Sequence, residues 1–174
     1  MALRSYRTEA GNGASVTVDN FMNTTGQAGY LVVHNTATSG AGAAFDDANS
    51  VVALASIVNG SGERPAGVLL QNVVNKDLTS THLNVHNRET QVGGKVALLS
   101  RGSVVTNAIA AATNPIPGDA AYFTVGGNFL PLAFASTVST GIAPSLQVPA
   151  AVRVGTFTSS KDLEGYAKIE ISII

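Results

Sequence analysis

The stretch KVALLSRGSVVT, residues 95–106, carries the clearest structural signal in this chain of 174 residues. Residues 95–100 and residues 103–106 are rich in aliphatic and β-branched side chains, which favour strands. Between them lie Arg101 and Gly102, and a glycine at such a position is typical of a tight turn. We therefore predict a β-hairpin here and an all-β protein around it.

Runs of the same kind recur along the chain, and glycine, proline and asparagine separate them. In the last run Ala167, Ile169, Ile171 and Ile173 alternate with polar residues, which is the pattern of a half-buried strand. About eight short strands with little helix predict a single compact β-barrel or a jelly-roll-like β-sandwich. Besides the two in residues 95–106, the expected strands cover residues 29–34, 50–58, 66–70, 81–86, 121–125, 129–132, 152–158 and 166–173.

Three local features qualify this strand pattern. Residues 50–58 are a continuous apolar run that a helix would also tolerate, although three Val and one Ile favour a strand. In residues 107–112 an asparagine precedes helix-forming residues, so we expect one or two helical turns there. Gly93 and Gly94 predict a turn that leads into the strand from residue 95, and Pro131 places its own strand at a sheet edge or a bulge.

The chain divides into an extended N-terminal arm, residues 1–13, and one β domain, residues 14–174. The length suits a single domain with a core of its own. Ten extended residues reach about 33–36 Å, far enough for the arm to embrace a neighbouring subunit. Inside the domain, residues 35–49 form a long loop, and loops of that length tend to be functional.

Charged residues are scarce and unevenly distributed. They make up 12% of the chain with a net charge of −1; residues 20–45 hold none, and residues 102–152 hold only Asp119. Such a surface belongs either to a β protein with a neutral polar exterior or to a subunit covered by neighbours, because interface cores are depleted in charge. Composition alone leaves both open. The second interpretation predicts that residues 20–45 and 102–152 contribute disproportionately to subunit contacts.

The same composition argues against several function classes. A nucleic-acid partner needs a basic face, which this charge balance does not supply. The sequence has no stretch of about 18 apolar residues to span a membrane, and its first residues lack the apolar stretch of a signal peptide. We therefore expect neither a membrane partner nor a targeting segment. With no cysteine, disulfides and thiolate metal sites are absent as well.

Candidate phosphate and metal motifs fail on their spacing. A phosphate loop at Gly94 would need a glycine in place of Glu89 and a serine or threonine in place of Val96. His82 and His86 share a face of their expected strand but lie about 13 Å apart along it, too far to hold one ion. We therefore expect no cofactor and no metal ion.

Two acidic pairs are the remaining candidates for catalysis. Asp46 and Asp47 lie in the long loop, and Asp162 and Glu164 lie in SKDLEG, residues 160–165. Paired carboxylates can hydrolyse glycosides when they flank a cleft, and their oxygens also suit calcium. Neither pair comes with the aromatic platforms of a sugar cleft or with enough ligands for calcium, and the second pair has the pattern of a polar hairpin turn. We therefore expect no catalytic residue.

Several motifs stand out from residue 64 to the end of the chain: RPAGVLL at 64–70, NVVNKDLT at 72–79, QVGGKVALL at 91–99 and VVTN at 104–107. PGDAAY at 117–122 then precedes a hairpin, and VGTF at 154–157 leads into DLEGYAKIE at 162–170. In these motifs the chain resembles the capsid decoration proteins, also called cement or head-stabilising proteins, of cyanophages and related tailed phages. The family pattern has a G-D-x-x-Y step before a hairpin and a V-G step at the last two strands. The resemblance does not extend to residues 1–60.

The resemblance implies a function without catalysis. It implies a β protein, commonly a trimer, that binds the outer surface of the capsid and bridges adjacent subunits of the major capsid protein. The protein would then be made in the host cytoplasm and reside on the exterior of the virion. A phage tail, fibre or surface module that recognises a receptor or a glycan is the alternative, and an enzyme ranks third.

Five residues are the candidates for contacts with neighbours. We expect Arg4, Tyr6 and Arg7 of the arm to reach an adjacent subunit, because Arg and Tyr are enriched at interface hot spots. A frayed terminus is the alternative for the arm. Tyr30 and Phe45, two aromatic residues of the uncharged stretch, complete the predicted interface.

Overall fold

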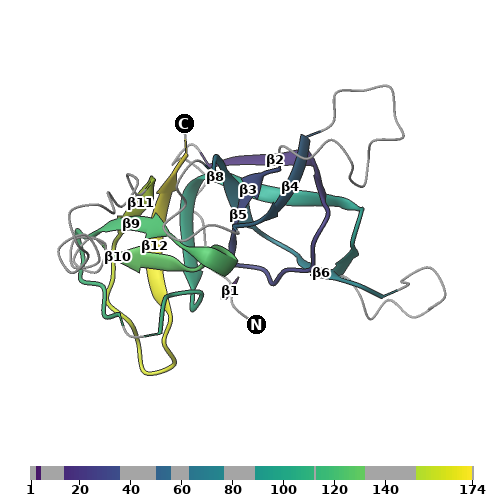
Figure 1. Cartoon of the computed structure of the whole chain (residues 1–174). Coiled ribbons are helices and arrows are strands. Elements are labelled where there is room, and N and C mark those ends of the chain that lie inside the picture. Colours follow the sequence, from purple (N-terminus) through teal and green to yellow (C-terminus); the bar gives the residue numbers. More distant parts are fainter. Residues whose placement is uncertain are drawn as a thin grey trace, which may run out of the picture.

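Two groups of strands share one long strand, β8 (Lys95–Thr106), in the computed structural model (Figure 1). The first half of β8 pairs with β2 (Ser15–Met22) and with β5 (Pro65–Leu69). Strands β4 (Ser50–Leu54) and β3 (Leu31–His34) connect β2 to β5, which closes a five-stranded barrel and confirms the predicted all-β class in its barrel form. The structure describes residues 3–4, 14–35, 50–55, 63–76, 89–111, 113–131 and 152–173.

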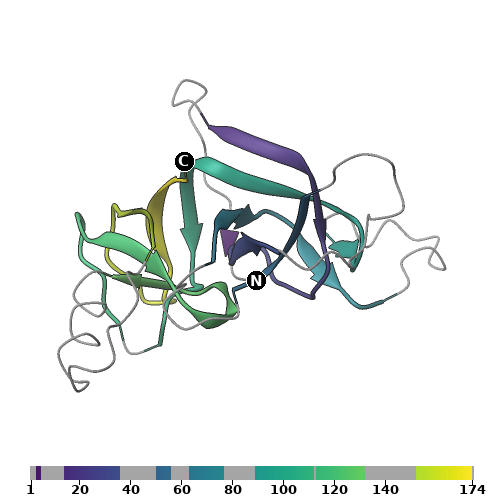
Figure 2. The ribbon, with the colours of Figure 1, turned by 45° about the horizontal axis from the view of Figure 1, so that its top comes forward.

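The second half of β8 begins an antiparallel sheet beside the barrel (Figure 2). We call this the C-terminal sheet; next to β8 it contains β12 (Ala167–Ser172), then β11 (Arg153–Phe157), β9 (Ala120–Phe123) and β10 (Phe129–Pro131). An isolated bridge between Ile109 and Phe129 brings the chain after β8 back to β10. The sheet therefore curls toward closure, and Pro131 lies on its edge strand as predicted.

Four short elements complete the described chain. Strand β1 (Leu3–Arg4) pairs with Val105 and Thr106 of β8, and β6 (Asn72–Val74) pairs in parallel with β7 (Glu89–Gln91) next to the barrel. The 3-10 turn η3 (Val125–Gly127), which joins β9 to β10, is the only helical element in the part of the chain that the structure describes.

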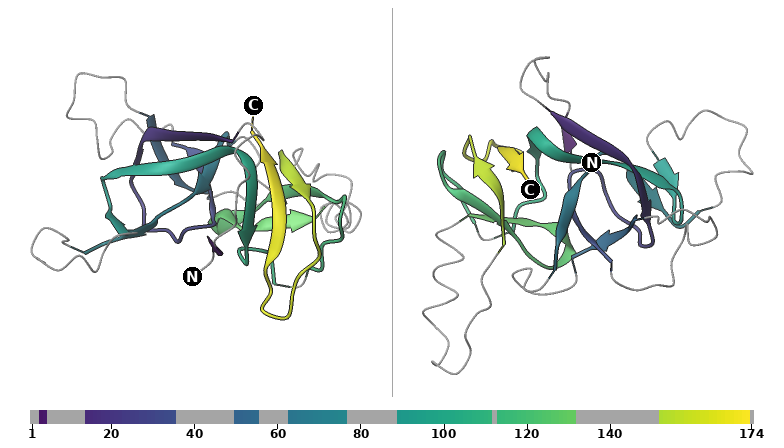
Figure 3. Two further views of the ribbon diagram at one scale, coloured as in Figure 1. Left: turned by 180° about the vertical axis from the view of Figure 1, so that it is seen from behind. Right: turned by 90° about the horizontal axis from the view of Figure 1, so that it is seen from above.

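Residues 95–106 form one continuous strand, so the predicted hairpin is wrong. Gly102 has a φ of +134°, and there the strand bends instead of reversing (Figure 3). Each half of β8 has two neighbours of its own, β2 and β5 before the bend and β12 and β1 after it. A reversal at Arg101 would give up this pairing on both edges, whereas the bend keeps the backbone hydrogen-bonded in both groups of strands.

The helical turns expected for residues 107–112 are also absent from the described part of that segment, residues 107–111. Phe129 N donates to Ala108 O at 2.8 Å, and Ala110 N donates to Phe129 O at 3.0 Å. Because β10 uses these backbone groups, the segment continues the sheet and does not form a helix.

The other strand predictions that fall on described residues are confirmed. They include β3 and β5 of the barrel, the β9–β10 hairpin and the β11–β12 pair. The run from residue 50 is a strand as far as Leu54, while residues 56–58 and 81–86 lie outside the described residues. Strands β1, β2, β6 and β7 have no counterpart among the predicted strands.

Side chains of the barrel strands point alternately into two cores. The first core fills the barrel, and the second lies between the barrel and the C-terminal sheet. Leu31 and Val33 face the second core while Val32 faces the first, so this continuous apolar run belongs to a strand covered on both faces. The barrel core contains Met22, Val32, Val52, Leu69, Val73, Val96 and Leu98; the second core includes Leu31, Val33, Val68, Leu99, Phe123, Phe129, Phe157, Ile169 and Ile171.

Candidate functional site

Two of the five candidate interface residues, Arg4 and Tyr30, lie in the described part of the chain. Arg4 lies in β1, whose backbone pairs with β8 of the same chain, and His34 ends β3 with an exposed side chain. Within the described ranges, no group of three or more His, Asp or Glu lies close enough to hold a metal ion. Outside those ranges lie Tyr6, Arg7, Phe45, Asp46, Asp47, His82 and His86.

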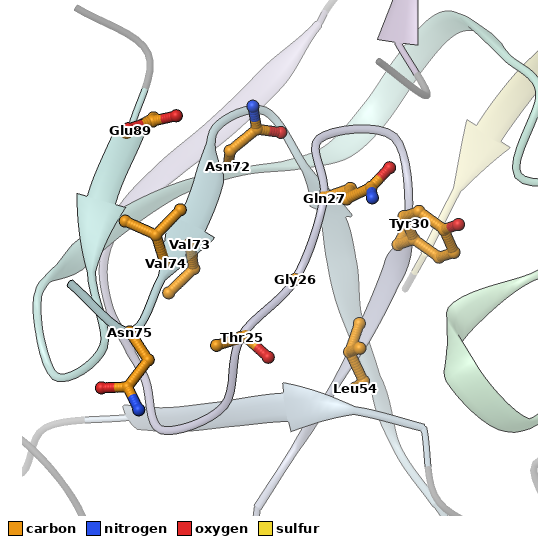
Figure 4. Close-up of a pocket in the computed structure, with 10 residues that line it drawn as sticks. All are labelled: Thr25, Gly26, Gln27, Tyr30, Leu54, Asn72, Val73, Val74, Asn75 and Glu89. Carbon is orange, nitrogen blue, oxygen red and sulfur yellow. The ribbon is translucent and has the colours of Figure 1, made fainter. Parts of the chain in front are cut away.

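Tyr30 lines a hollow of about 710 Å³ at one end of the barrel (Figure 4). The loop between β2 and β3 contributes one part of the lining, and the end of β4 with β6 and β7 contributes the rest. We call this the barrel-end hollow. Its lining residues are Thr25, Gly26, Gln27, Tyr30, Leu54, Asn72, Val73, Val74, Asn75 and Glu89.

Hydrogen bonds hold the β2–β3 loop across the end of the barrel. Gly26 N donates to Val73 O at 3.0 Å, and Val73 N donates to Gly26 O at 2.7 Å. Ala28 N donates to Asn72 Oδ1 at 2.9 Å, which orients the Asn72 amide. The hollow is therefore built on backbone that is held at two adjacent points.

Neutral hydrogen-bonding groups dominate the lining of this hollow. The side chains of Thr25, Gln27 and Asn75 are exposed and hydrogen-bond to no other described residue. Leu54 and the two valines supply apolar surface, and Glu89 is the one charged residue in the lining. Amides and hydroxyls that both donate and accept, beside apolar surface, suit an uncharged polar partner such as exposed peptide groups or a hydroxyl-rich ligand.

A second hollow, of about 500 Å³, lies over three neighbouring strands of the C-terminal sheet and is charged. Arg153 Nε donates to Gly155 O at 3.2 Å and its Nη2 donates to Thr156 Oγ1 at 2.7 Å, so the guanidinium lies along its own strand. The side chains of Arg101 and Glu170 are exposed and form no ion pair or hydrogen bond with another described residue. We call this the sheet hollow; Gly102, Ser103, Gly155, Thr156, Ile171 and Ser172 line it together with Arg101, Arg153 and Glu170.

The connection between β11 and β12, residues 158–166, projects from the C-terminal sheet as a hairpin loop (Figure 1). Asp162 Oδ1 accepts hydrogen bonds from Glu164 N at 3.0 Å and from Tyr166 N at 2.8 Å. The polar turn predicted for this acidic pair is therefore confirmed. At its apex Leu163 is fully exposed, with a relative exposure of 107%. We call residues 160–165 the hairpin tip.

The glycine turn predicted before β8 is also confirmed. Gly94 N donates to Gln91 O at 2.9 Å, and Gly93 N donates to Met22 O at 2.8 Å. Both amides are thus used inside the fold, which agrees with the rejection of a phosphate loop at this position. Lys95 Nζ lies 5.7 Å from the centroid of the Phe21 ring, at the distance of a cation–π contact.

No protein-family model matches the chain, and a comparison with curated proteins finds no match. No helix in the described ranges is long and apolar enough to cross a membrane. The physical features that bear on function are the two hollows and the hairpin tip.

Sequence patterns do not single out Gln27, Asn72 or the residues of the sheet hollow. Asn72 joins Tyr30 in one site only because Val73 pairs with Gly26, a contact between distant parts of the chain. Leu163 does carry a local signal, since it is a lone apolar residue between two acidic residues in a polar turn.

Proposed function

We propose that this protein is a non-enzymatic structural protein of the virion. It binds the outer capsid surface as a trimer, cements adjacent subunits of the major capsid protein and so stabilises the head. The resemblance from residue 64 onward supplies the class of protein. The barrel-end hollow is the observation that best supports a binding role, because uncharged groups dominate its lining, backbone pairing holds it, and the side chains of Thr25, Gln27 and Asn75 hydrogen-bond to no other described residue.

The barrel-end hollow is the proposed contact with the capsid. Interface cores are depleted in charge, and Tyr30 adds an aromatic residue of the type enriched at hot spots. Three linked copies raise the effective concentration of each contact, so a small hollow with modest affinity is sufficient in a trimer.

A receptor- or glycan-binding module of a tail or fibre is the second candidate. The amides and hydroxyls of the same hollow would also suit the hydroxyl groups of a sugar. Copy number separates the two candidates. Mass spectrometry of purified virions is expected to find the protein in hundreds of copies per particle if it decorates the capsid; a few copies to a few dozen would contradict the proposal and favour a tail or fibre.

Truncation of two exposed amides tests the hollow directly. The double variant Gln27→Ala with Asn75→Ala removes donors and acceptors without touching the core, since both side chains are exposed. We expect it to bind about tenfold more weakly to capsids stripped of the protein. The matched control, Asn107→Ala with Asn114→Ala, removes two exposed amides away from the hollow and is expected to bind as the wild type does. Equal binding by the two double variants would overturn the role of the hollow.

The arm needs a separate test. Deleting residues 2–10 also removes β1 and its pairing with β8, so loss of binding after that deletion has two explanations. The point variants Tyr6→Ala and Arg7→Ala leave β1 in place and are expected to weaken binding to stripped capsids or to sister subunits. Undiminished binding and association in both the deletion and the point variants would overturn the arm prediction.

A further inference from the structure

Leu163 is the most exposed large apolar side chain among the described residues. Its relative exposure is 107%, against 62% for Ile116, 55% for Val18 and 48% for Val16. A leucine held fully in water at the end of a projecting turn gains free energy when a partner covers it. Asp162 and Glu164 flank it, so a partner would also meet negative charge.

The hairpin tip presents this leucine on a well-ordered turn. Asp162 N donates to Tyr166 O at 2.8 Å, and Gly165 N donates to Asp162 O at 3.0 Å, in addition to the two bonds accepted by Asp162 Oδ1. A turn held by four hydrogen bonds loses little conformational freedom on binding. The tip therefore has the properties of a preorganised anchor.

The sheet hollow lies at the other end of the same β11–β12 pair. Arg153 begins β11 and Ser172 ends β12, whereas the tip joins the end of β11 to the start of β12. Residues 157–159 separate Thr156, which lines the hollow, from the hairpin tip at residues 160–165. A tip cannot fold back into the hollow of its own chain without dismantling this pair of strands.

We propose that the hairpin tip of one copy docks into the sheet hollow of a second copy of this chain. Leu163 packs over Gly102 and Gly155, where the floor of the hollow is bare backbone, and against the aliphatic parts of the arginine side chains. The carboxylates of Asp162 and Glu164 meet the guanidinium groups of Arg101 and Arg153.

The charges on the two surfaces are of opposite sign. Arg101 and Arg153 outweigh Glu170, which gives the hollow a net charge of +1; on the tip, Asp162 and Glu164 outweigh Lys161, which gives −1. Lys161 turns away from the apex, because its Nζ donates to Ala110 O at 3.4 Å. Lys168, two residues before Glu170 on β12, adds positive charge on the strand next to Arg153 and opposes none of these contacts.

Contacts of this kind join two different surfaces, so each copy has one tip and one hollow to offer. Head-to-tail contacts of that type close into a ring when the rotation between copies allows it. The inference deepens the proposed function and rests on its trimer, for which it assigns the contact between sister subunits. The contact between sister subunits can be measured without capsids. An experiment that disproves this contact is therefore distinct from one that disproves capsid binding.

Sedimentation of the purified full-length protein tests the contact. We expect Glu164→Lys and Arg101→Glu each to weaken self-association, and the chain carrying both to regain it, because the two charges then exchange sides. Leu163→Ser is expected to weaken each contact about tenfold or more, in keeping with the value of burying a leucine. Ile116→Ser removes an exposed apolar side chain elsewhere and is expected to associate as the wild type does.

Every outcome of this experiment bears on the proposal. A wild-type protein that stays monomeric overturns it, and so does a trimer that is indifferent to Leu163→Ser. A trimer that both charge variants weaken but their combination does not restore also contradicts the tip-to-hollow contact. Thermal unfolding of each variant, expected to be unchanged because all three side chains are exposed, shows that altered association is not a folding defect.

Discussion

The barrel and the C-terminal sheet share β8 and one core, but they differ in where they carry charge. Strands β3, β4 and β5 of the barrel contain no charged residue between their bounds. The solvent face of the C-terminal sheet carries Arg101, Arg153, Lys168 and Glu170. The closed barrel thus offers at its end a hollow with a single charged residue, Glu89, whereas the hollow of the open sheet contains two arginines and a glutamate.

Burial inside the chain explains part of this difference. Leu31, Val32 and Val33 face two cores of their own chain, so no position in that run is available to a charged side chain. The absence of charge in residues 31–33 therefore has a cause that needs no neighbouring subunit. Contacts with neighbours remain a prediction for the loop that lines the barrel-end hollow and for residues 102–152, of which residues 132–151 lie outside the described residues.

The largest effects are expected from the two cores. Phe157→Ala in the second core should cost about 3–5 kcal/mol of unfolding free energy, and Met22→Ala in the barrel core about 2–5 kcal/mol, since both side chains are fully buried. Because β8 runs through both regions, we expect one cooperative transition in urea for both variants. Separate transitions for the barrel and the sheet after Phe157→Ala would show that they fold independently.

The next largest loss of unfolding free energy is expected at the contact between Gly127, beside the C-terminal sheet, and β3 of the barrel. A Cβ on Gly127 would lie 2.3 Å from Leu31 O, and Gly127 has a φ of +76°, so Gly127→Ala should cost about 3 kcal/mol. Gly126 has a similar φ of +78°, but its nearest obstacle is a side-chain atom at 3.4 Å. Gly126→Ala should therefore cost only about 1 kcal/mol in the same denaturation experiment. Equal costs would mean that close approach to β3 does not stabilise the pairing of the two regions.

The buried hydroxyl of Thr106, at the end of β8, hydrogen-bonds to the loop before β3 of the barrel and to the segment that leads to the C-terminal sheet. Thr106 Oγ1 donates to Gly29 O at 3.2 Å and accepts from Ala108 N at 3.0 Å, and the residue is fully buried. Thr106→Val keeps the shape but leaves both groups without a partner, so it should cost about 1–3 kcal/mol by chemical denaturation. Thr25→Val, at an exposed threonine, is the matched control and should change stability by less than about 0.5 kcal/mol.

The smallest effect concerns Lys161, the one cation among the described residues with a shifted pKa. Burial lowers the pKa of the Lys161 ammonium below its ordinary value of 10.5, so folding disfavours its charged form. Stability should rise slightly as pH increases from the lowered pKa toward 10.5, and Lys161→Met should abolish that rise. Because Lys161 is only partly buried and solvent screens its charge, the change should stay below about 0.5 kcal/mol in denaturation curves at neutral and alkaline pH. A fall in stability over this window would reverse the assigned direction.

The two regions also differ in how far their structure follows from the sequence. The β9–β10 and β11–β12 pairs are predicted because their contacts are local and residues 166–173 alternate cleanly. Strand β2 pairs in parallel with β4, which lies far along the chain. No short sequence pattern indicates such a pairing, so the sequence does not predict β2. At Gly102, a bend in one long strand and a hairpin turn require the same residue type, so only the neighbours on each side distinguish them.

The residues of the two hollows also differ in whether the sequence alone predicts them. Tyr30 is predicted from its residue type, whereas Asn72 reaches the hollow through pairing between distant segments. The sheet hollow depends on the register that places Arg101 opposite Ser172 and Glu170 opposite both Ser103 and Thr156. Packing sets the register between strands that are distant in sequence. A short sequence motif does not indicate this register, so the sequence does not predict the sheet hollow.

Hydrogen–deuterium exchange of the full-length protein, alone and on stripped capsids, tests most directly whether the barrel-end hollow and the sheet hollow have different partners. On capsids we predict added protection of the loop amides in residues 23–27 and 71–76, which border the barrel-end hollow. The amides of the hairpin tip should be equally protected in both states, because a sister subunit already covers them. Protection that appears only over the C-terminal sheet, or nowhere, would contradict this account.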